Sequence, residues 1–164
     1  MRIVGIDPGC ESTGYGIIES NGSDHRVVVY GAVKTAAQSP FHERLFKIYT
    51  ELDDLLAREK VGAMAIEEVF YAANVKSALK LSHARGVILL VAAKHGLSIC
   101  EYSPLEIKKG VVGYGRAGKE QVQSMVSFLL GLPQPPTPSD AADALAVALC
   151  HAHRLRTAEL LEHA

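Results

Sequence analysis

The side chains best suited to chemistry are four carboxylates: Asp7, Glu67, Asp140 and Asp143. Asp7 and Glu67 each end a four-residue apolar run of the kind found in buried central strands. Asp140 and Asp143 are three residues apart, a spacing that puts two side chains on one face of a helix, with only alanines between them. A carboxylate in such surroundings is costly unless a cation balances its charge.

This pattern favours a metal site. If the two apolar strands are neighbours, Asp7 and Glu67 are held roughly 5 Å apart, where like charges repel unless a cation lies between them. Carboxylate ligands without a His-Cys cluster favour Mg²⁺ or Mn²⁺ over zinc. We therefore expect two Mg²⁺ ions about 4 Å apart, with Mn²⁺ as a substitute, to activate a water and stabilise the leaving oxygen of a phosphodiester.

Two points stay open at this stage. Neighbouring residues of a strand point to opposite faces, so Glu67 and Glu68 cannot both join Asp7, and periodicity does not say which one does. Each acid also has an ordinary structural explanation: Asp140 suits a first helical turn, Glu67 and Glu68 can form an exposed pair, and Asp7 can cap the Asp-Pro-Gly turn. The combination of the four favours the metal site.

Hydrophobic periodicity predicts the elements that position these acids. We expect strands over residues 2–7, 14–19, 27–33, 62–69 and 97–102. We expect helices over residues 41–60, 74–95, 104–112, 119–130 and from 139 to 153 or beyond. Three strands in a meander, followed by strands that alternate with helices, predict an α/β fold with a mixed sheet covered by helices on its faces. The length of 164 residues predicts a single domain over 1–164.

Charge is distributed unevenly along the chain. Residues 69–119 hold eight basic and two acidic residues, a net charge of +6, whereas the remainder carries −7. A basic centre suits a groove for DNA, since phosphate contacts supply most non-specific affinity, although a solvated helix face is the plainer explanation. The candidate DNA contacts are Lys76, Lys80, Arg85, Lys108, Lys109, Arg116 and Lys119, with Phe70 as an aromatic that can stack on an unpaired base.

Other sequence features bear on the location of the protein in the cell and on the roles of its cysteines and histidines. The longest apolar run, residues 87–93, is too short to cross a membrane, and the first residues lack a secretory signal, so we expect a cytoplasmic protein. The three cysteines lack metal or redox spacing and are expected to be free thiols. His151 and His153 are near the expected end of the last helix, where histidines complement the helix dipole, and we assign neither as a ligand.

Five sequence blocks occur in order along residues 1–153. They are Gly-Ile-Asp-Pro-Gly at 5–9 with Thr-Gly-Tyr-Gly at 13–16, Ala-Ile-Glu-Glu-Val-Phe at 65–70, Ser-Ala-Leu-Lys-Leu at 77–81 with Ala-Arg-Gly at 84–86, Val-Val-Gly at 111–113, and Asp-Ala-Ala-Asp-Ala-Leu-Ala at 140–146. In this order the blocks resemble the RuvC family of Holliday junction resolvases. The resemblance implies a ribonuclease-H-like fold, a homodimer with two active sites, and metal-dependent nicking of two strands of a four-way DNA junction in recombination and repair.

The resemblance also implies roles for individual residues. The catalytic acids of the family fall on Asp7, Glu67, Asp140 and Asp143, which selects Glu67 over Glu68. Lys108 and Lys119 match lysines near the scissile phosphate, and Phe70 matches an aromatic that stacks on bases at the crossover. Cooperation with the RuvA and RuvB branch-migration proteins is a further implication.

Two other functions fit parts of the sequence. The Asp-Pro-Gly turn followed by Gly14 resembles the phosphate-binding hairpin of actin-like ATPases and kinases, but that class needs a second, related domain and hairpin, and neither is visible in residues 1–164. A junction-binding module that has lost catalysis would lack one of the acids, and none is missing.

Overall fold

The computed structural model describes residues 1–68 and 74–162, and its centre is a five-stranded sheet. The strands are β1 (Arg2–Asp7), β2 (Ser12–Ser20), β3 (His25–Lys34), β4 (Ala63–Glu67) and β5 (Ser98–Tyr102). The helices are α1 (Phe41–Glu59), α2 (Val75–Lys94), α3 (Pro104–Val112), α4 (Lys119–Leu129) and α5 (Ser139–Glu162). Among the described residues, none of the helices combines the length and apolar character of a transmembrane span.

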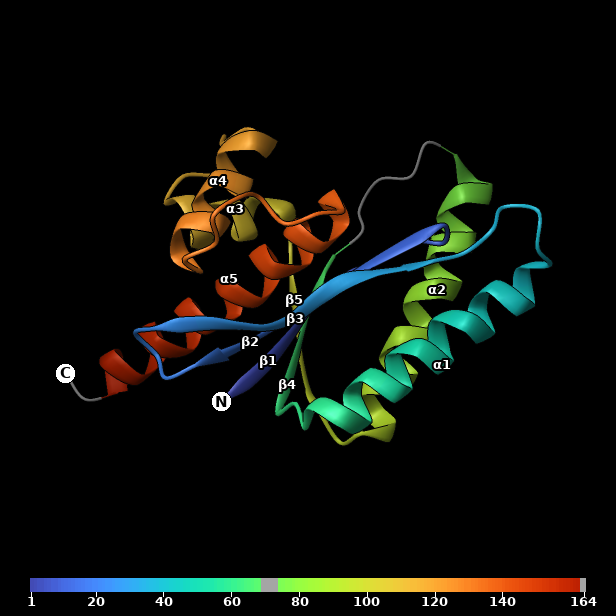
Figure 1. Ribbon diagram of the computed structural model, residues 1–164, viewed down its shortest axis with the longest axis horizontal. Coiled ribbons are helices and arrows are strands. Elements are labelled where there is room, and N and C mark those ends of the chain that lie inside the picture. The colour runs from blue at the N-terminus through green and yellow to red at the C-terminus, as the bar shows by residue number, and fades with distance from the viewer. Residues whose placement is uncertain (69–73, 163–164) are drawn as a thin grey trace.

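The sheet has the order β3-β2-β1-β4-β5, in which β2 is antiparallel to both of its neighbours, β1 and β3, whereas β4 is parallel to β1 and β5 is parallel to β4. Helices α1 and α2 cover one face, and α3, α4 and α5 cover the other (Figure 1). The expected mixed sheet with helices on both faces is confirmed, and its central strands are buried on both sides, as their continuous apolar character predicts.

Alternation along the strands divides the core between these two faces. In β1, Val4 and Ile6 pack with α1 and α2, whereas Ile3 packs with α5. In β4, Met64 and Ile66 join the first core and Ala65 joins the second. Asp7 and Glu67 follow the same alternation as Ile3 and Ala65, so both belong to the α5 face of the sheet.

Helix α5 packs unusually close to the sheet because small residues meet at the contact. A Cβ added to Gly5 would lie 2.0 Å from the main-chain oxygen of Ala144, and one added to Gly14 would lie 2.1 Å from that of Asp140. The facing side of α5 is rich in alanines that are almost fully buried. Glycine on the strands and alanine on the helix therefore bring the first turns of α5 against the end of β1.

Most element boundaries agree with the sequence prediction within one or two residues, and two features of the helices matter later. Helix α5 continues to Glu162, nine residues past His153, so His153 does not lie at a helix C-terminus. The apolar residues of α2 lie in two environments: Ile88 and Val91 are buried in the core, whereas Leu79 and Leu90 are 57% and 61% exposed.

The close approach of α5 yields a stability prediction. We expect Gly5→Ala to lower the free energy of unfolding by about 1–3 kcal/mol or more, since the added methyl meets helix backbone and cannot be accommodated by a rotamer change. The matched control is Gly86→Ala in α2, where a methyl meets nothing within 4 Å and alanine favours the helix by up to about 1 kcal/mol. Urea denaturation of both variants measures the difference, and equal stabilities would contradict the tight contact.

Candidate active site

Strand register brings Asp7 and Glu67 together. Strands β1 and β4 are parallel neighbours with Ile6 opposite Ile66, so the next pair along the register is Asp7 and Glu67. Neighbouring strands lie about 4.8 Å apart, which is the separation that makes two carboxylates repel. Glu67 points with Asp7 toward α5, so the structure answers on geometric grounds the question that strand periodicity left open between Glu67 and Glu68.

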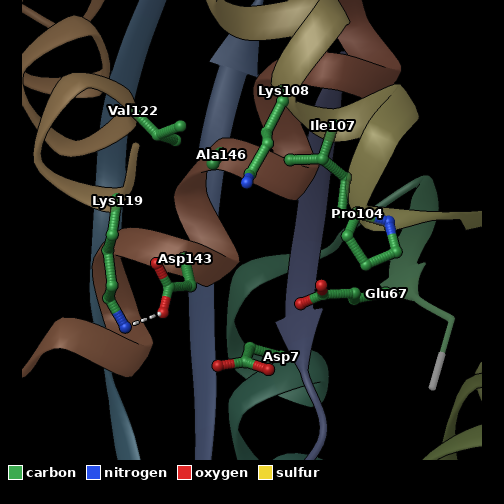
Figure 2. Close-up of a pocket in the computed structure, with 9 residues that line it drawn as sticks. All are labelled: Asp7, Glu67, Pro104, Ile107, Lys108, Lys119, Val122, Asp143 and Ala146. Atoms are coloured by element: carbon green, nitrogen blue, oxygen red, sulfur yellow. Dashed lines mark hydrogen bonds and ion pairs between the residues drawn. The ribbon is translucent and has the colours of Figure 1, made fainter. Parts of the chain in front are cut away.

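The first turns of α5 supply two more acids to the same place. Asp7, Asp140 and Asp143 each offer a carboxylate oxygen, and these oxygens all lie within 4.8 Å of one another. Figure 2 shows the carboxylates of Asp7, Glu67 and Asp143 turned toward a common space between β1, β4 and α5. Glu67 is not part of the set of mutually close oxygens, but it lines the same cavity as Asp7 and Asp143.

The electrostatics of the cluster favour the binding of a cation. Burial, followed by the charges of Glu67, Asp143 and Asp140, raises the pKa of Asp7 to about 8. Burial and the charge of Asp143 also raise the pKa of Glu67. Carboxyl groups in this arrangement ionise together only when positive charge is added, and an all-oxygen set of this kind suits a hard divalent cation. The residues therefore fit a metal such as Mg²⁺.

Two lysines stand beside the acids. Lys119, the first residue of α4, places its Nζ 2.8 Å from Oδ2 of Asp143, and this contact raises the pKa of the lysine. Lys108 of α3 lines the same cavity of about 290 Å³. The walls combine acids, both lysines and apolar side chains from α3 and α4, so the cavity has room for a group that carries negative charge next to the carboxylates (Figure 2).

The remaining predicted DNA contacts lie elsewhere. Lys109 on α3, Arg116 in the segment before α4 and Lys76 on α2 are exposed on the surface and do not line the cavity. Lys80 is half-buried, with its Nζ 5.8 Å from the centre of the Phe41 ring. Phe70 lies outside the described residues.

Arg85 has structural partners rather than a free surface position. Its Nη1 donates a hydrogen bond of 2.8 Å to the main-chain oxygen of Glu67, and its Nη2 pairs with the carboxylate of Glu101 on β5. Only 17% of its side chain is exposed. Arg85 therefore fixes the end of the strand that carries Glu67, a role that the charge pattern of the sequence does not indicate.

Sequence reasoning also missed Ser12, whose hydroxyl donates a hydrogen bond of 2.5 Å to Oδ2 of Asp140. The two residues are 128 positions apart, and they meet because the start of β2 faces the first turn of α5. A serine after the Asp-Pro-Gly turn carries no local signal of this contact. Ser12 orients the Asp140 carboxylate and satisfies one of its lone pairs.

Comparison with known proteins agrees with this geometry. The family model described as crossover junction endodeoxyribonuclease RuvC matches residues 3–151. This chain belongs to the RuvC family. A RuvC crossover junction endodeoxyribonuclease of Syntrophomonas wolfei is 49% identical over 162 residues, covering 99% of this chain and 94% of its relative.

Solved structures extend the comparison to the fold. Thermus thermophilus RuvC in complex with a Holliday junction substrate has a TM-score of 0.92 and 37% identity, covering 96% of each chain. The yeast mitochondrial Holliday junction resolvase Ydc2 has a TM-score of 0.68 at 12% identity, over 98% of this chain and 80% of its own. The fold is therefore that of the RuvC resolvases, and the ribonuclease-H-like architecture that the sequence resemblance implies is confirmed.

The raised pKa of Asp7 predicts how the metal-free protein responds to pH. Because the folded carboxyl keeps its proton to about pH 8 and the unfolded one loses it near 3.8, its contribution to stability is complete below pH 3.8 and is lost as pH rises to about 8. We expect the free energy of unfolding in chelator to fall across this range, and saturating Mg²⁺ to reverse much of the fall. Urea denaturation with chelator or with Mg²⁺ measures both effects.

The matched variant for this experiment is Asp7→Asn, which removes the titrating group. Burial lowers the pKa of His25 and His151, and these histidines oppose the trend below about pH 6.5. The quantity to follow is therefore the difference between wild type and Asp7→Asn at each pH. A difference that does not change with pH in chelator would mean that Asp7 is not in an uncompensated acidic cluster.

Proposed function

We propose that this chain is a structure-selective endonuclease that resolves four-way (Holliday) DNA junctions by nicking two strands symmetrically, in homologous recombination and DNA repair. Membership of the RuvC family supports the endonuclease activity. The similarity to a RuvC solved with a Holliday junction supports the substrate. The observation that carries the proposal is the convergence of the Asp7, Asp140 and Asp143 carboxylates beside a cavity lined by Lys108 and Lys119.

The proposed catalytic residues and metal ligands are Asp7, Glu67, Asp140 and Asp143. Asp7 and Glu67 would hold the Mg²⁺ ions from the sheet side, and Asp140 and Asp143 would hold them from α5. When bound, two such ions would activate a water and stabilise the leaving oxygen of a phosphodiester. Mn²⁺ is expected to substitute, since it prefers the same oxygen ligands.

The lysines would act on the phosphate itself. Lys119 is exposed at the mouth of the cavity and is held by Asp143, so its ammonium group can donate to a phosphate oxygen without leaving its carboxylate partner. Lys108 can contribute from the α3 side of the cavity. Groups that stabilise charge developing in a transition state typically contribute on the order of 10² to 10³ in rate.

The DNA outside the active site would contact the basic surface. Lys76, Lys80, Lys109 and Arg116 remain the proposed phosphate contacts, and Phe70 remains the proposed stacking residue at the crossover. For Arg85 the contacts to Glu67 and Glu101 favour a positioning role over a direct DNA contact.

The proposals on oligomeric state, location and partner proteins rest on what RuvC family membership implies and on one feature of the surface of α2. The exposed leucines of α2, Leu79 and Leu90, give a helix face that a second copy of the chain would cover, so that a homodimer presents two active sites to a four-way junction. We also propose that residues 1–164 form one nuclease domain that acts in the cytoplasm, in cooperation with the RuvA and RuvB branch-migration proteins.

The central test is the variant Asp143→Asn. It keeps the size of the side chain but removes one ligand charge, so we expect a synthetic four-way junction to be bound with little change and no longer cut in Mg²⁺. The matched control is Asp54→Asn, an exposed acid on α1, which should cut like wild type. The assay compares gel-shift affinity and nicking on four-way, forked and linear DNA, with Mg²⁺, Mn²⁺ or chelator.

Each outcome of that assay is informative. Retained cutting by Asp143→Asn rejects the assignment of this acid. Loss of both binding and cutting points to a folding defect, which circular dichroism identifies. Hydrolysis of ATP in the absence of DNA would revive the actin-like alternative, and junction binding without cutting by the wild type would indicate an inactive binding module.

The dimer is tested by sedimentation equilibrium. We expect the wild type at micromolar concentration to sediment at twice the monomer mass of 17.6 kDa, and Leu90→Asp to shift it toward the monomer because a charge would enter the apolar contact. The control is Phe128→Asp on α4, an equally apolar and even more exposed position, which should leave the dimer intact. A wild type that sediments only as monomer would contradict the proposed homodimer.

A further inference from the structure

Two histidines from distant parts of the chain meet on the α5 side of the sheet, away from the acidic cluster. His25 begins β3 and His153 lies in the second half of α5. Their Nε2 atoms are 3.1 Å apart, and their ring centroids are separated by 5.0 Å with the rings tilted at 56°. Both side chains are only partly buried.

The other nitrogen of each ring already has a partner. Nδ1 of His153 lies 2.8 Å from the main-chain oxygen of Gly110, which can only accept, so Nδ1 carries the proton and Nε2 of a neutral ring carries a lone pair. Nδ1 of His25 lies 3.0 Å from the hydroxyl of Ser20. A backbone oxygen or hydroxyl behind Nδ1, with Nε2 directed forward, is the arrangement found around histidines that ligate metals.

The hydroxyl of Ser20 allows His25 to adopt either of its two neutral tautomers without any movement of the two imidazole rings. A hydroxyl both donates and accepts, so it can donate to Nδ1 of His25, in which case the Nε2 proton of His25 bonds to His153. It can equally accept from Nδ1, which leaves lone pairs on both facing Nε2 atoms. The change is a tautomer exchange on His25 and involves no change in net charge.

We propose that His25 and His153 form a binding site for a divalent transition metal of the Zn²⁺ class. Zinc binds imidazole nitrogen at about 2.0–2.1 Å, so two nitrogens on one ion are roughly 2.8–3.4 Å apart for N–Zn–N angles between a right angle and the tetrahedral angle. The observed Nε2 separation of 3.1 Å falls in that range. Solvent completes the coordination, and the ion joins α5 to the β2–β3 hairpin and, through Gly110, to α3.

The surroundings are consistent with a neutral pair that accepts a cation. Burial, followed by the neighbouring His153, lowers the pKa of His25, which favours the neutral ring that a metal ion needs. Asp24 supplies negative charge next to His25, and Arg156, which reaches toward the main-chain oxygen of Gly22, supplies opposing positive charge. These two charges act on a bound cation in opposite directions.

This site is separate from the acidic one in place and in chemistry. His153 is ten residues beyond Asp143 on the same helix, which is roughly 15 Å along its axis. Imidazole selects zinc, nickel or copper, whereas the carboxylates select Mg²⁺ or Mn²⁺. The proposal does not depend on junction cutting, and an ion at this position would stabilise the fold without taking part in hydrolysis.

The test uses the full-length chain without a histidine tag, in saturating Mg²⁺ so that the carboxylates are occupied, with Zn²⁺ as the probe. NMR of the imidazole nitrogens should show the Nε2 resonances of both His25 and His153 shifting on addition of Zn²⁺. Zn²⁺ should also raise Tm by about 2–8 °C, because the folded state holds the two imidazoles together and therefore binds the ion more tightly than the unfolded chain does. His25→Gln and His153→Gln should each abolish the rise in Tm.

The control variant is His42→Gln, an exposed histidine on α1, which should respond to Zn²⁺ like the wild type. Asp143→Asn should also keep the response, because that acid belongs to the other site. Unchanged Nε2 resonances of His25 and His153 at saturating Zn²⁺ would overturn the proposal. A rise in Tm that persists in both glutamine variants would do the same, since it would locate the zinc elsewhere.

Discussion

Mutual repulsion among buried carboxylates is the constraint on which the rest of this structure depends. Strand register sets Asp7 beside Glu67, and the first turns of α5 bring Asp140 and Asp143 close to them. The fold therefore concentrates more negative charge at this site than the neighbouring lysines balance. Lys119 balances part of that charge at the rim. Burial and the charges of the neighbouring acids raise the pKa of Asp7 to about 8, and additional positive charge would offset both effects.

The packing that creates this repulsion is made of very small residues. Glycines on β1 and β2 and alanines on α5 allow helix backbone to touch strand backbone, and no larger residue fits at Gly5 or Gly14 without displacing the helix. Stability and function are thus linked through one contact: the same close approach that buries the apolar core of α5 also brings its first turns to the end of β1. Ser12 and Arg85 then fix two of the acids from outside the cluster.

Much of this arrangement can be predicted from the sequence, and the exceptions have clear causes. Apolar runs that end in Asp7 and Glu67 reveal both the strands and the acids, because periodicity and burial are local properties. The choice of Glu67 over Glu68 needs the face on which Ala65 packs, which only the folded sheet provides. Three contacts join distant parts of the chain and therefore cannot be predicted from any local sequence pattern. They are those of Ser12 with Asp140, of Arg85 with Glu101 and of His25 with His153. The charge pattern suggested a DNA contact for Arg85, yet its partners are within the protein.

The most direct test of the central claim is a crystal structure grown with Mn²⁺ above pH 8, with anomalous scattering used to locate the ions. The repulsion account predicts anomalous peaks within bonding distance of the Asp7, Asp140 and Asp143 carboxylates, with all three still converged. If these carboxylates remained together at that pH with no anomalous peak among them, the acids would tolerate one another without a cation, and the account would be wrong.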